Sequence, residues 1–223
     1  MVRLKIYQEK MVPSREIMPR IMIDQYNFRQ KGVWNRGSEI VIALLEEPIW
    51  WNRPVKSDVF LKQEADGLYS LNFPYFGGNN DFKAQYNTLL NVGCVPVAVQ
   101  LRQTDLEKPF DKQKLIAMPV ATVYKTLVDL GVEPKNLTSI HNDLLYCGKK
   151  FMGVETIFKN GCCSINFIVT LFYKPEESIF KRLTGKYALA RPITGIIEET
   201  NLFTKEQFID TLMKNMGNYL KDL

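Results

Sequence analysis

Residues 141–173 read HNDLLYCGKKFMGVETIFKNGCCSINFIVTLFY, and the pattern of this stretch decides the fold. Gly148 and the Asn160-Gly161 pair interrupt runs of β-branched, aromatic and other apolar residues. Glycine suits a tight turn, and Asn-Gly between two such runs is typical of a two-residue hairpin turn. We therefore predict a meander of consecutive antiparallel strands over Leu144–Tyr146, Lys150–Phe158 and Cys162–Tyr173.

A helix is predicted upstream of the meander. From Asp111 to Leu130 the apolar residues recur at helical spacing, and Gly131 follows as a terminating residue. Pro119 leaves two possibilities open, because proline removes a backbone donor from a helix. Either the helix kinks at Pro119, or the ordered helix begins near Met118.

Helices are also expected towards both ends of the chain. Near the C-terminus, Thr204 and Gln207 fit a capping box, and apolar residues follow on one helical face as far as Leu220. Near the N-terminus, apolar residues at helical spacing predict a helix that opens at Pro13 and extends to Tyr26.

The remaining apolar runs are typical of strands. The run Glu39–Leu45 is continuous, as in a strand buried on both faces, and Trp50-Trp51 ends it near a Pro-bounded loop. Further strands are predicted over Val55–Lys62, Leu68–Phe73 and Val95–Leu101. This element order predicts an α+β fold, a mixed and mainly antiparallel sheet covered by helices. No composition shift divides residues 1–223, so we expect one domain without an accessory C-terminal domain.

Composition and charge narrow the class of protein. The 29 basic and 24 acidic side chains give a net charge of +5 without a long basic run, so we expect no nucleic-acid partner. No apolar stretch reaches the roughly 18 residues of a membrane helix, and the start of the chain has no signal-peptide pattern. The 4 cysteines lack the spacing of a zinc site, and a single histidine excludes a two-histidine metal site. We therefore expect a cytoplasmic protein with reduced thiols and no membrane contact.

The most informative motif lies at the start of the meander. Residues 142–144 (NDL) lead through Gly148 into residues 150–153 (KFMG). This arrangement resembles the lipoate-protein ligase family, in the superfamily that also holds biotin-protein ligases and octanoyltransferases. In that family an Asn-Asp-Leu/Ile strand turns through a glycine into a Lys-x-x-Gly sequence. The likeness extends over residues 108–221 and includes Lys186 and Arg191, where the family has a lysine and an arginine before its last helix.

The resemblance implies acyl-adenylate chemistry at these residues. The family's lysine contacts both the acyl carboxylate and the adenylate phosphate, which gives Lys150 the catalytic role. A cation held on a strand suits this role, because it stabilises charge that spreads over the carboxylate and the α-phosphate. Asp143 would contact Mg²⁺. The resemblance further implies that ligand or adenylate is bound by Gly77, Gly78, Asn142, Asp143, Phe151, Met152 and Gly153.

A plainer interpretation of the same residues stays open. Lys149 and Lys150 also fit a solvated hairpin pair, Gly148 an ordinary turn residue, and Asn142-Asp143 a local turn closed by its own side chain.

The first half of the chain departs from the family pattern. The family's acyl-binding loop carries Arg-Arg, two small residues and Gly-Gly-Gly, followed shortly by His-Asp. This chain has YFGGNN at residues 75–80, and its nearest substitute for His-Asp is Tyr86-Asn87. Gly77 and Gly78 could fold over a ligand or form a simple turn. Both the arginine charge and the His-Asp pair are therefore missing from this region.

Two classes of function remain open. The first is an acyl ligase or transferase that uses ATP and Mg²⁺ to activate lipoate, octanoate or biotin. It would pass the acyl group to a lysine of a carrier-protein domain, with a separate accessory subunit in place of the family's second domain. A variant of this function would carry the acyl group as a thioester on Cys162 or Cys163, close to the expected site. The second class is a catalytically degenerate relative that serves as a ligand-binding or protein-assembly module, as the lost arginines suggest.

Overall fold

The structure is a computed structural model of the whole chain. It describes residues 5–8, 28, 37–45, 49–55, 60–63, 69–74, 88–90, 93–106, 108–173 and 193–221. The strands are β1 (Lys5–Gln8), β2 (Glu39–Ile42), β3 (Ile49–Val55), β4 (Phe60–Gln63), β5 (Tyr69–Pro74), β6 (Thr88–Leu90), β7 (Cys94–Arg102), β8 (Leu137–Ile140), β9 (Asp143–Tyr146), β10 (Lys149–Lys159) and β11 (Cys162–Thr170). The helices are α2 (Lys112–Asp129), α4 (Ile196–Thr200) and α5 (Lys205–Lys221), with short 3₁₀ turns at Gln103–Asp105 and Pro134–Asn136.

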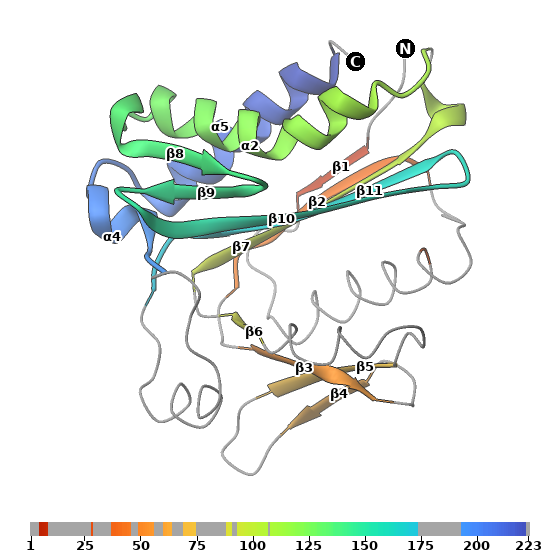
Figure 1. The fold of residues 1–223 in the computed structure, drawn as a ribbon, viewed down its shortest axis with the longest axis horizontal. Helices are drawn as coiled ribbons and strands as arrows, with labels where there is room; N and C mark the ends of the chain where they lie inside the picture. Colours follow the sequence, from red (N-terminus) through yellow and green to blue (C-terminus); the bar gives the residue numbers. More distant parts are fainter. Residues whose placement is uncertain are drawn as a thin grey trace.

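The main body is a 7-stranded sheet in the order β1-β2-β7-β11-β10-β9-β8. Its pairs are antiparallel except for β1 and β2, which run parallel. A separate 4-stranded sheet has the order β4-β5-β3-β6. The predicted α+β class with a mixed, mainly antiparallel sheet is therefore confirmed (Figure 1).

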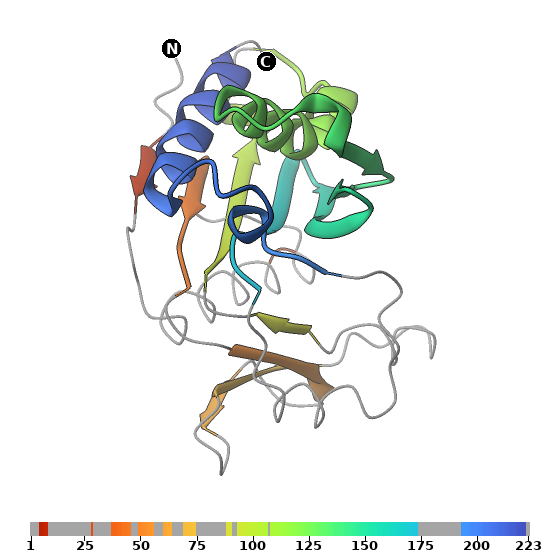
Figure 2. The ribbon, with the colours of Figure 1, turned by 90° about the vertical axis from the view of Figure 1, so that its left-hand side faces the viewer.

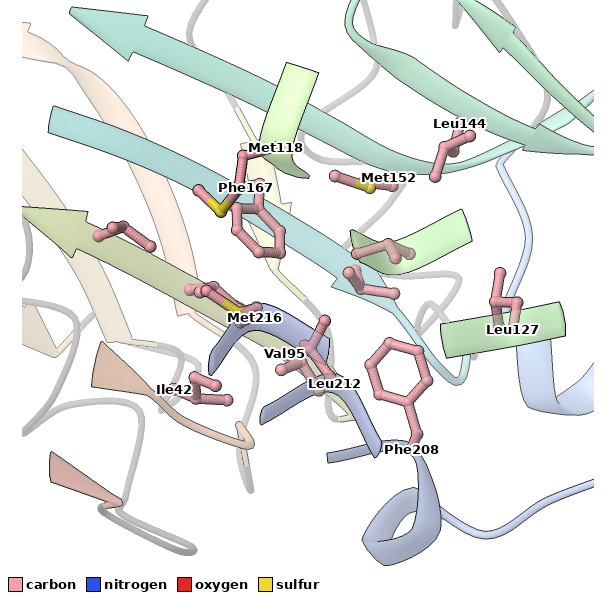
Figure 3. Packing of buried hydrophobic residues seen from close by; sticks show 14 of the residues in the cluster. Ile42, Val95, Met118, Leu127, Leu144, Met152, Phe167, Phe208, Leu212 and Met216 are labelled. Carbon is pink, nitrogen blue, oxygen red and sulfur yellow. The ribbon is translucent and has the colours of Figure 1, made fainter. Parts of the chain in front are cut away.

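Helices α2 and α5 and the small sheet lie on opposite sides of the large sheet (Figures 1 and 2). We call the side covered by α2 and α5 the helix face and the other side, towards the small sheet, the open face, although several side chains on it, such as Gln100 and Ser164, are also buried. On the helix face, alternate residues of the long strands interlock with the two helices, as Met152, Phe167, Phe208 and Leu212 illustrate (Figure 3). The larger hydrophobic cluster of the described residues therefore lies between this face and the helices, and a smaller one, of Phe28, Cys162 and Ile157, lies on the other side of the sheet.

The structure confirms the predicted meander and its turns. Asn160 and Gly161 both have positive φ, as a two-residue hairpin turn of this kind requires, and Gly148 also has positive φ. The capping box forms as predicted, because Thr204 N–H donates to Gln207 Oε1 at 2.8 Å and Gln207 N–H donates to Thr204 Oγ at 3.2 Å. These short-range signals are sufficient to place the ends of their elements.

The structure settles the alternatives at Pro119. The helix begins at Lys112, where the Asp111 side chain accepts a hydrogen bond from Lys114 N–H, and it continues through Pro119. The helix ends as predicted at Gly131, which has positive φ, and Val132 N–H donates back to Leu127 O at 2.9 Å.

One strand prediction is wrong. The sequence favoured a single strand over Val55–Lys62 preceded by a loop, whereas β3 contains Trp50, Trp51 and Pro54 and ends at Val55. A second strand, β4, begins at Phe60. The strand tolerates Pro54 because its register against β5 shifts between Trp51 and Pro54, which removes a regular ladder position. Strands β1, β6 and β8 and helix α4 were not predicted from the sequence.

Several predictions concern residues outside the described part of the chain. They are the helix opening at Pro13, the loop with Gly77 and Gly78, and the segment with Lys186 and Arg191. Within the described residues, no helix has the length and apolar character needed to cross a membrane.

A polar cluster joins the start of β2 to the end of β7. Asp105 accepts two hydrogen bonds from Arg102, at 3.0 and 2.9 Å, and two from Ser38, at 2.7 and 2.8 Å. The bonds from Arg102 and Ser38 stabilise the carboxylate and lower the pKa of Asp105 to about 2. Because the folded pKa lies below the ordinary value, the ionised carboxylate stabilises the folded state.

We predict that this stabilisation depends on pH. It should be complete above the unfolded pKa of about 3.9 and should be lost as the pH falls towards the folded pKa. Replacing Asp105 by Asn should lower the free energy of unfolding by roughly 1–2 kcal/mol at pH 6, and by much less at pH 2.5. Urea denaturation of both proteins at the two pH values checks this. An equal difference at both values would contradict it.

Candidate functional site

The Lys-x-x-Gly sequence lies on β10 next to a β-bulge. In a regular strand, residues three apart point to opposite faces, so Lys150 and Gly153 would be separated by the sheet. The register between β9 and β10 shifts between Lys150 and Met152, which inserts Phe151 as an extra residue. Phe151 and Met152 consequently both enter the core of the helix face, and Gly153 returns to the open face with Lys150.

The bulge assembles a group of three residues on the open face. Lys150 Nζ and Asp143 Oδ1 form an ion pair of 2.8 Å, with both side chains partly exposed. A Cβ atom on Gly153 would lie 3.2 Å from Lys150 Nζ and 3.6 Å from Asp143 Oδ1. The bare backbone of Gly153 thus leaves room for the ammonium group and the carboxylate beside it. We call these three residues the lysine site.

The other predicted binding residues lie in different surroundings. The side chains of Phe151 and Met152 are 1% exposed, so they support the lysine site from the core side and do not line the open face. Asn142 is exposed in the turn between β8 and β9, next to Asp143. The binding roles of these residues stay predictions, as does that of Gly77 and Gly78.

A segment that the sequence analysis missed holds the lysine site from one end. We call residues 193–200 the α4 segment. Ile193 forms a β-bridge with Lys150, and Thr194 N–H donates to Lys150 O at 2.9 Å. Glu199 accepts hydrogen bonds from Lys149 Nζ and from Thr194 Oγ, both at 2.6 Å. These bonds to Lys149 and Thr194 lower the pKa of Glu199. The segment therefore holds the Lys150 carbonyl and the neighbouring Lys149 side chain.

The same segment also packs on the end of β11. Glu198 accepts a hydrogen bond from Tyr173 N–H at 2.7 Å, and Ile197 N–H donates to Leu171 O at 3.0 Å. A Cβ on Gly195 would lie 2.7 Å from the Tyr173 backbone nitrogen, so only glycine permits this close approach. Helix α4 was not predicted from the sequence because it has only 5 residues and no repeating apolar pattern.

The two cysteines considered as nucleophiles lie far from the lysine site, which corrects the expectation that they are close to it. The register pairs Cys162 with Lys159 at the tip of the hairpin, whereas Lys150 lies near the start of β10. At about 3.3 Å per residue this separation is roughly 30 Å. Cys163 is 1% exposed, and its burial raises the pKa of its thiol to about 12. A buried thiol with a raised pKa is a poor nucleophile.

The donor set of the lysine site limits what metal it could hold. Within the described residues, no group of three or more His, Cys, Asp and Glu side chains could bind a metal ion. A single carboxylate such as Asp143 suits Mg²⁺ only when phosphate oxygens supply most of the other ligands. Chemically, the site combines one cation, one carboxylate and an open backbone, which is an arrangement that can bind an anion such as a carboxylate or a phosphate.

The chain resembles known proteins in fold and not in sequence. No family model and no curated protein matches it. Among solved structures it is similar to a lipoate-protein ligase A bound with ATP, at 12% identity and a TM-score of 0.61, covering 98% of this chain and 85% of that chain. It is also similar to a T. acidophilum protein with bound lipoic acid, a candidate lipoate protein ligase, at 12% identity and a TM-score of 0.62, over 98% and 86% of the two chains. A third structure, of a bi-partite lipoate protein ligase and its E2 lipoyl domain from Thermoplasma acidophilum, gives 12% identity and a TM-score of 0.59, over 98% and 85%.

These likenesses define the class of fold. The chain has the fold of the lipoate-protein ligases, and the resemblance drawn from the sequence is confirmed at the level of the fold. An identity of 12% carries no information about substrate or catalysis.

We predict that Glu199 holds the backbone of Lys150 in place. In Glu199→Gln, the ion pair with Lys149 is lost and the contact with Thr194 is weakened. The Thr194 amide should then exchange its hydrogen about tenfold faster, because its bond to Lys150 O opens more often. The loss of an exposed ion pair should lower global stability by less than about 1 kcal/mol.

Amide exchange measured by NMR checks this prediction. Glu206→Gln, at the start of α5, is the control, because Glu206 pairs with Lys205 and not with the α4 segment. Unchanged exchange of Thr194 in Glu199→Gln would show that the ion pair does not restrain Lys150.

Proposed function

We propose that the protein is an acyl ligase that activates a small carboxylic acid and transfers it to a carrier protein. The observation that carries this proposal is the lysine site, where a β-bulge brings Lys150, Asp143 and Gly153 to the open face. The fold of the lipoate-protein ligases supports the same activity. Lipoate, octanoate and biotin are the candidate acids.

The proposed reaction has two steps. In the first, a carboxylate oxygen of the acid attacks the α-phosphorus of ATP, which forms an acyl-adenylate and releases pyrophosphate. In the second, the amine of a carrier lysine attacks the acyl carbon, which forms an amide and releases AMP and a proton. ATP supplies the leaving group that makes the carboxylate reactive.

The residues of this chain serve both steps. Lys150 would bind the carboxylate and the α-phosphate together, where its charge offsets the negative charge that accumulates as the two react. Asp143 holds the ammonium group in place in the structure, and it would share Mg²⁺ with phosphate oxygens when nucleotide is bound. The α4 segment keeps the Lys150 backbone fixed, so that little reorganisation is needed during the reaction.

The proposal includes two protein partners, namely the carrier protein that accepts the acyl group and an accessory subunit. One similar structure is of a bi-partite lipoate protein ligase and its E2 lipoyl domain. We propose a lysine-bearing carrier domain of this kind as the acceptor, and a separate accessory subunit as a second component.

A second candidate function is a ligand-binding or protein-assembly module without catalysis. The sequence observation in its favour is the YFGGNN stretch at residues 75–80, which lacks the arginines of the family's acyl-binding loop. This function predicts a stable protein partner and no dependence of ligand binding on ATP.

We predict that Lys150→Ala abolishes acid activation. In the wild-type protein, ATP, Mg²⁺ and one of the three acids together should raise the melting temperature and support ATP–pyrophosphate exchange, because a ligand that binds only the folded state stabilises it. The variant should lose the joint effect, and its exchange rate should fall at least about 100-fold.

Lys135→Ala is the matched control, since the Lys135 side chain is 76% exposed and forms an ion pair with the nearby Glu133, away from the lysine site. It should behave as the wild type does. Failure of every combination of ATP and acid to stabilise the wild-type protein or to support exchange would exclude the ligase and leave the binding module.

A further inference from the structure

The ammonium group that would bind the acid already has a partner within the chain. Lys150 Nζ lies 2.8 Å from Asp143 Oδ1. An ammonium group and a carboxylate at this distance form a charge-assisted hydrogen bond. Asp143 opens β9 and Lys150 lies on β10, and the missing side chain of Gly153 leaves room for both groups. The positive charge that the proposed function needs is therefore offset by a carboxylate of the same site.

The neighbouring lysine does not supply a replacement charge. Lys149 Nζ lies 2.6 Å from Glu199 Oε1 of the α4 segment. The two lysines at the start of β10 thus each pair with a carboxylate of another element. The two positive and two negative charges of these four groups cancel. Together they have no net charge with which to attract the carboxylate of an acid.

An acid that binds Lys150 has to compete with Asp143. The side chains of Lys150 and Asp143 are 36% and 26% exposed, so an anion can reach the ammonium group from solvent. Its carboxylate would then lie close to that of Asp143. Two carboxylates that share one ammonium group repel each other, because the single positive charge offsets only one of them. Asp143 therefore weakens the binding of an acid for as long as it stays on Lys150.

A bound nucleotide would give Asp143 a different partner. A single carboxylate fits Mg²⁺ when phosphate oxygens supply most of the other ligands, and ATP carries such oxygens. Asp143 would then turn from Lys150 towards the Mg²⁺ of the nucleotide, which leaves the ammonium group of Lys150 for the acid and the α-phosphate. Coupling between two ligands is reciprocal, so a nucleotide that strengthens the binding of the acid is itself bound more tightly when the acid is present.

We propose that Asp143 makes the binding of the acid depend on Mg²⁺ and nucleotide. This inference rests on the proposed function and describes how its site is regulated. Without nucleotide, Asp143 occupies Lys150 and the acid binds weakly. With nucleotide, the same ammonium group binds the acid tightly. The protein would thereby retain an acid only when ATP is bound to activate it.

Binding measurements on the wild-type protein test the proposed dependence. Calorimetry measures the affinity for lipoate, octanoate and biotin, first alone and then with Mg²⁺ and the α,β-methylene analogue of ATP. This analogue cannot release pyrophosphate, so binding is measured without reaction. We expect the acid that the protein uses to bind at least about tenfold more tightly with Mg²⁺ and the analogue than alone. Equal affinity under the two conditions would overturn the inference.

Variants assign the effect to Asp143. Asp143→Asn removes the competing charge, so it should bind the acid alone at least about tenfold more tightly than the wild type does. Asp143→Glu keeps a carboxylate and should bind the acid alone as weakly as the wild type. Glu133→Gln is the matched control for net charge, because Glu133 pairs with the exposed Lys135, and it should also behave as the wild type. Melting temperatures show whether each variant folds, and the wild-type comparison tests the inference even if Asp143→Asn does not.

The outcomes separate this inference from the proposed function. Acid binding that does not depend on nucleotide, together with ATP–pyrophosphate exchange, would overturn the inference and leave the ligase intact. Nucleotide-dependent binding that Asp143→Asn makes independent of nucleotide, without any exchange, would support the inference and exclude the ligase. No binding of any acid under either condition would overturn the inference, as would a folded Asp143→Asn variant that binds the acid alone no more tightly than the wild type.

Discussion

The alternation of side chains along β10 is the constraint on which the described structure depends. This strand forms one wall of the core on the helix face, and it carries the candidate site on the open face. A regular strand could not do both with the spacing that the sequence has, because Lys150 and Gly153 would point in opposite directions. One inserted residue, Phe151, resolves the conflict by entering the core next to Met152. Burial of the Phe151 side chain thus stabilises the fold, and the bulge that Phe151 forms places Lys150 and Gly153 on the same face of the sheet.

The two faces of the sheet differ in how they are stabilised. The helix face is closed by apolar side chains from the sheet, α2 and α5, and burial of this kind is the main source of stability in a domain of this size. The open face combines buried apolar side chains, such as Val41 and Ala98, with polar contacts that include the Lys150–Asp143 pair and the bonds of Gln100, Ser164 and Asn166. Polar contacts contribute little net stability when exposed, but they fix positions and directions. Catalysis and recognition require such fixed positions, whereas folding does not.

This chain and the lipoate-protein ligases share a fold although their sequences differ, and packing explains how both can hold. A sheet with helices on one side can be built from many apolar sequences, so 12% identity is enough to retain it. Lys150, Asp143 and Gly153 each supply something that most residue types lack, namely a positive charge, a negative charge and the absence of a side chain. The missing arginines at residues 75–80 are the feature of this chain that an acyl-ligase function must accommodate.

The sequence by itself determined the elements whose signals are local. The Asn160-Gly161 turn, the Thr204–Gln207 capping box and the end of α2 at Gly131 follow from the conformations and hydrogen bonds of a few adjacent residues. Only the tertiary structure decided that Phe151 forms a bulge, that Thr194 and Glu199 hold the Lys150 backbone, and that Cys162 and Cys163 lie away from it. These depend on strand register and on contacts between residues far apart in the chain. No local pattern encodes them, because they arise when a complete sheet must match side chains across neighbouring strands.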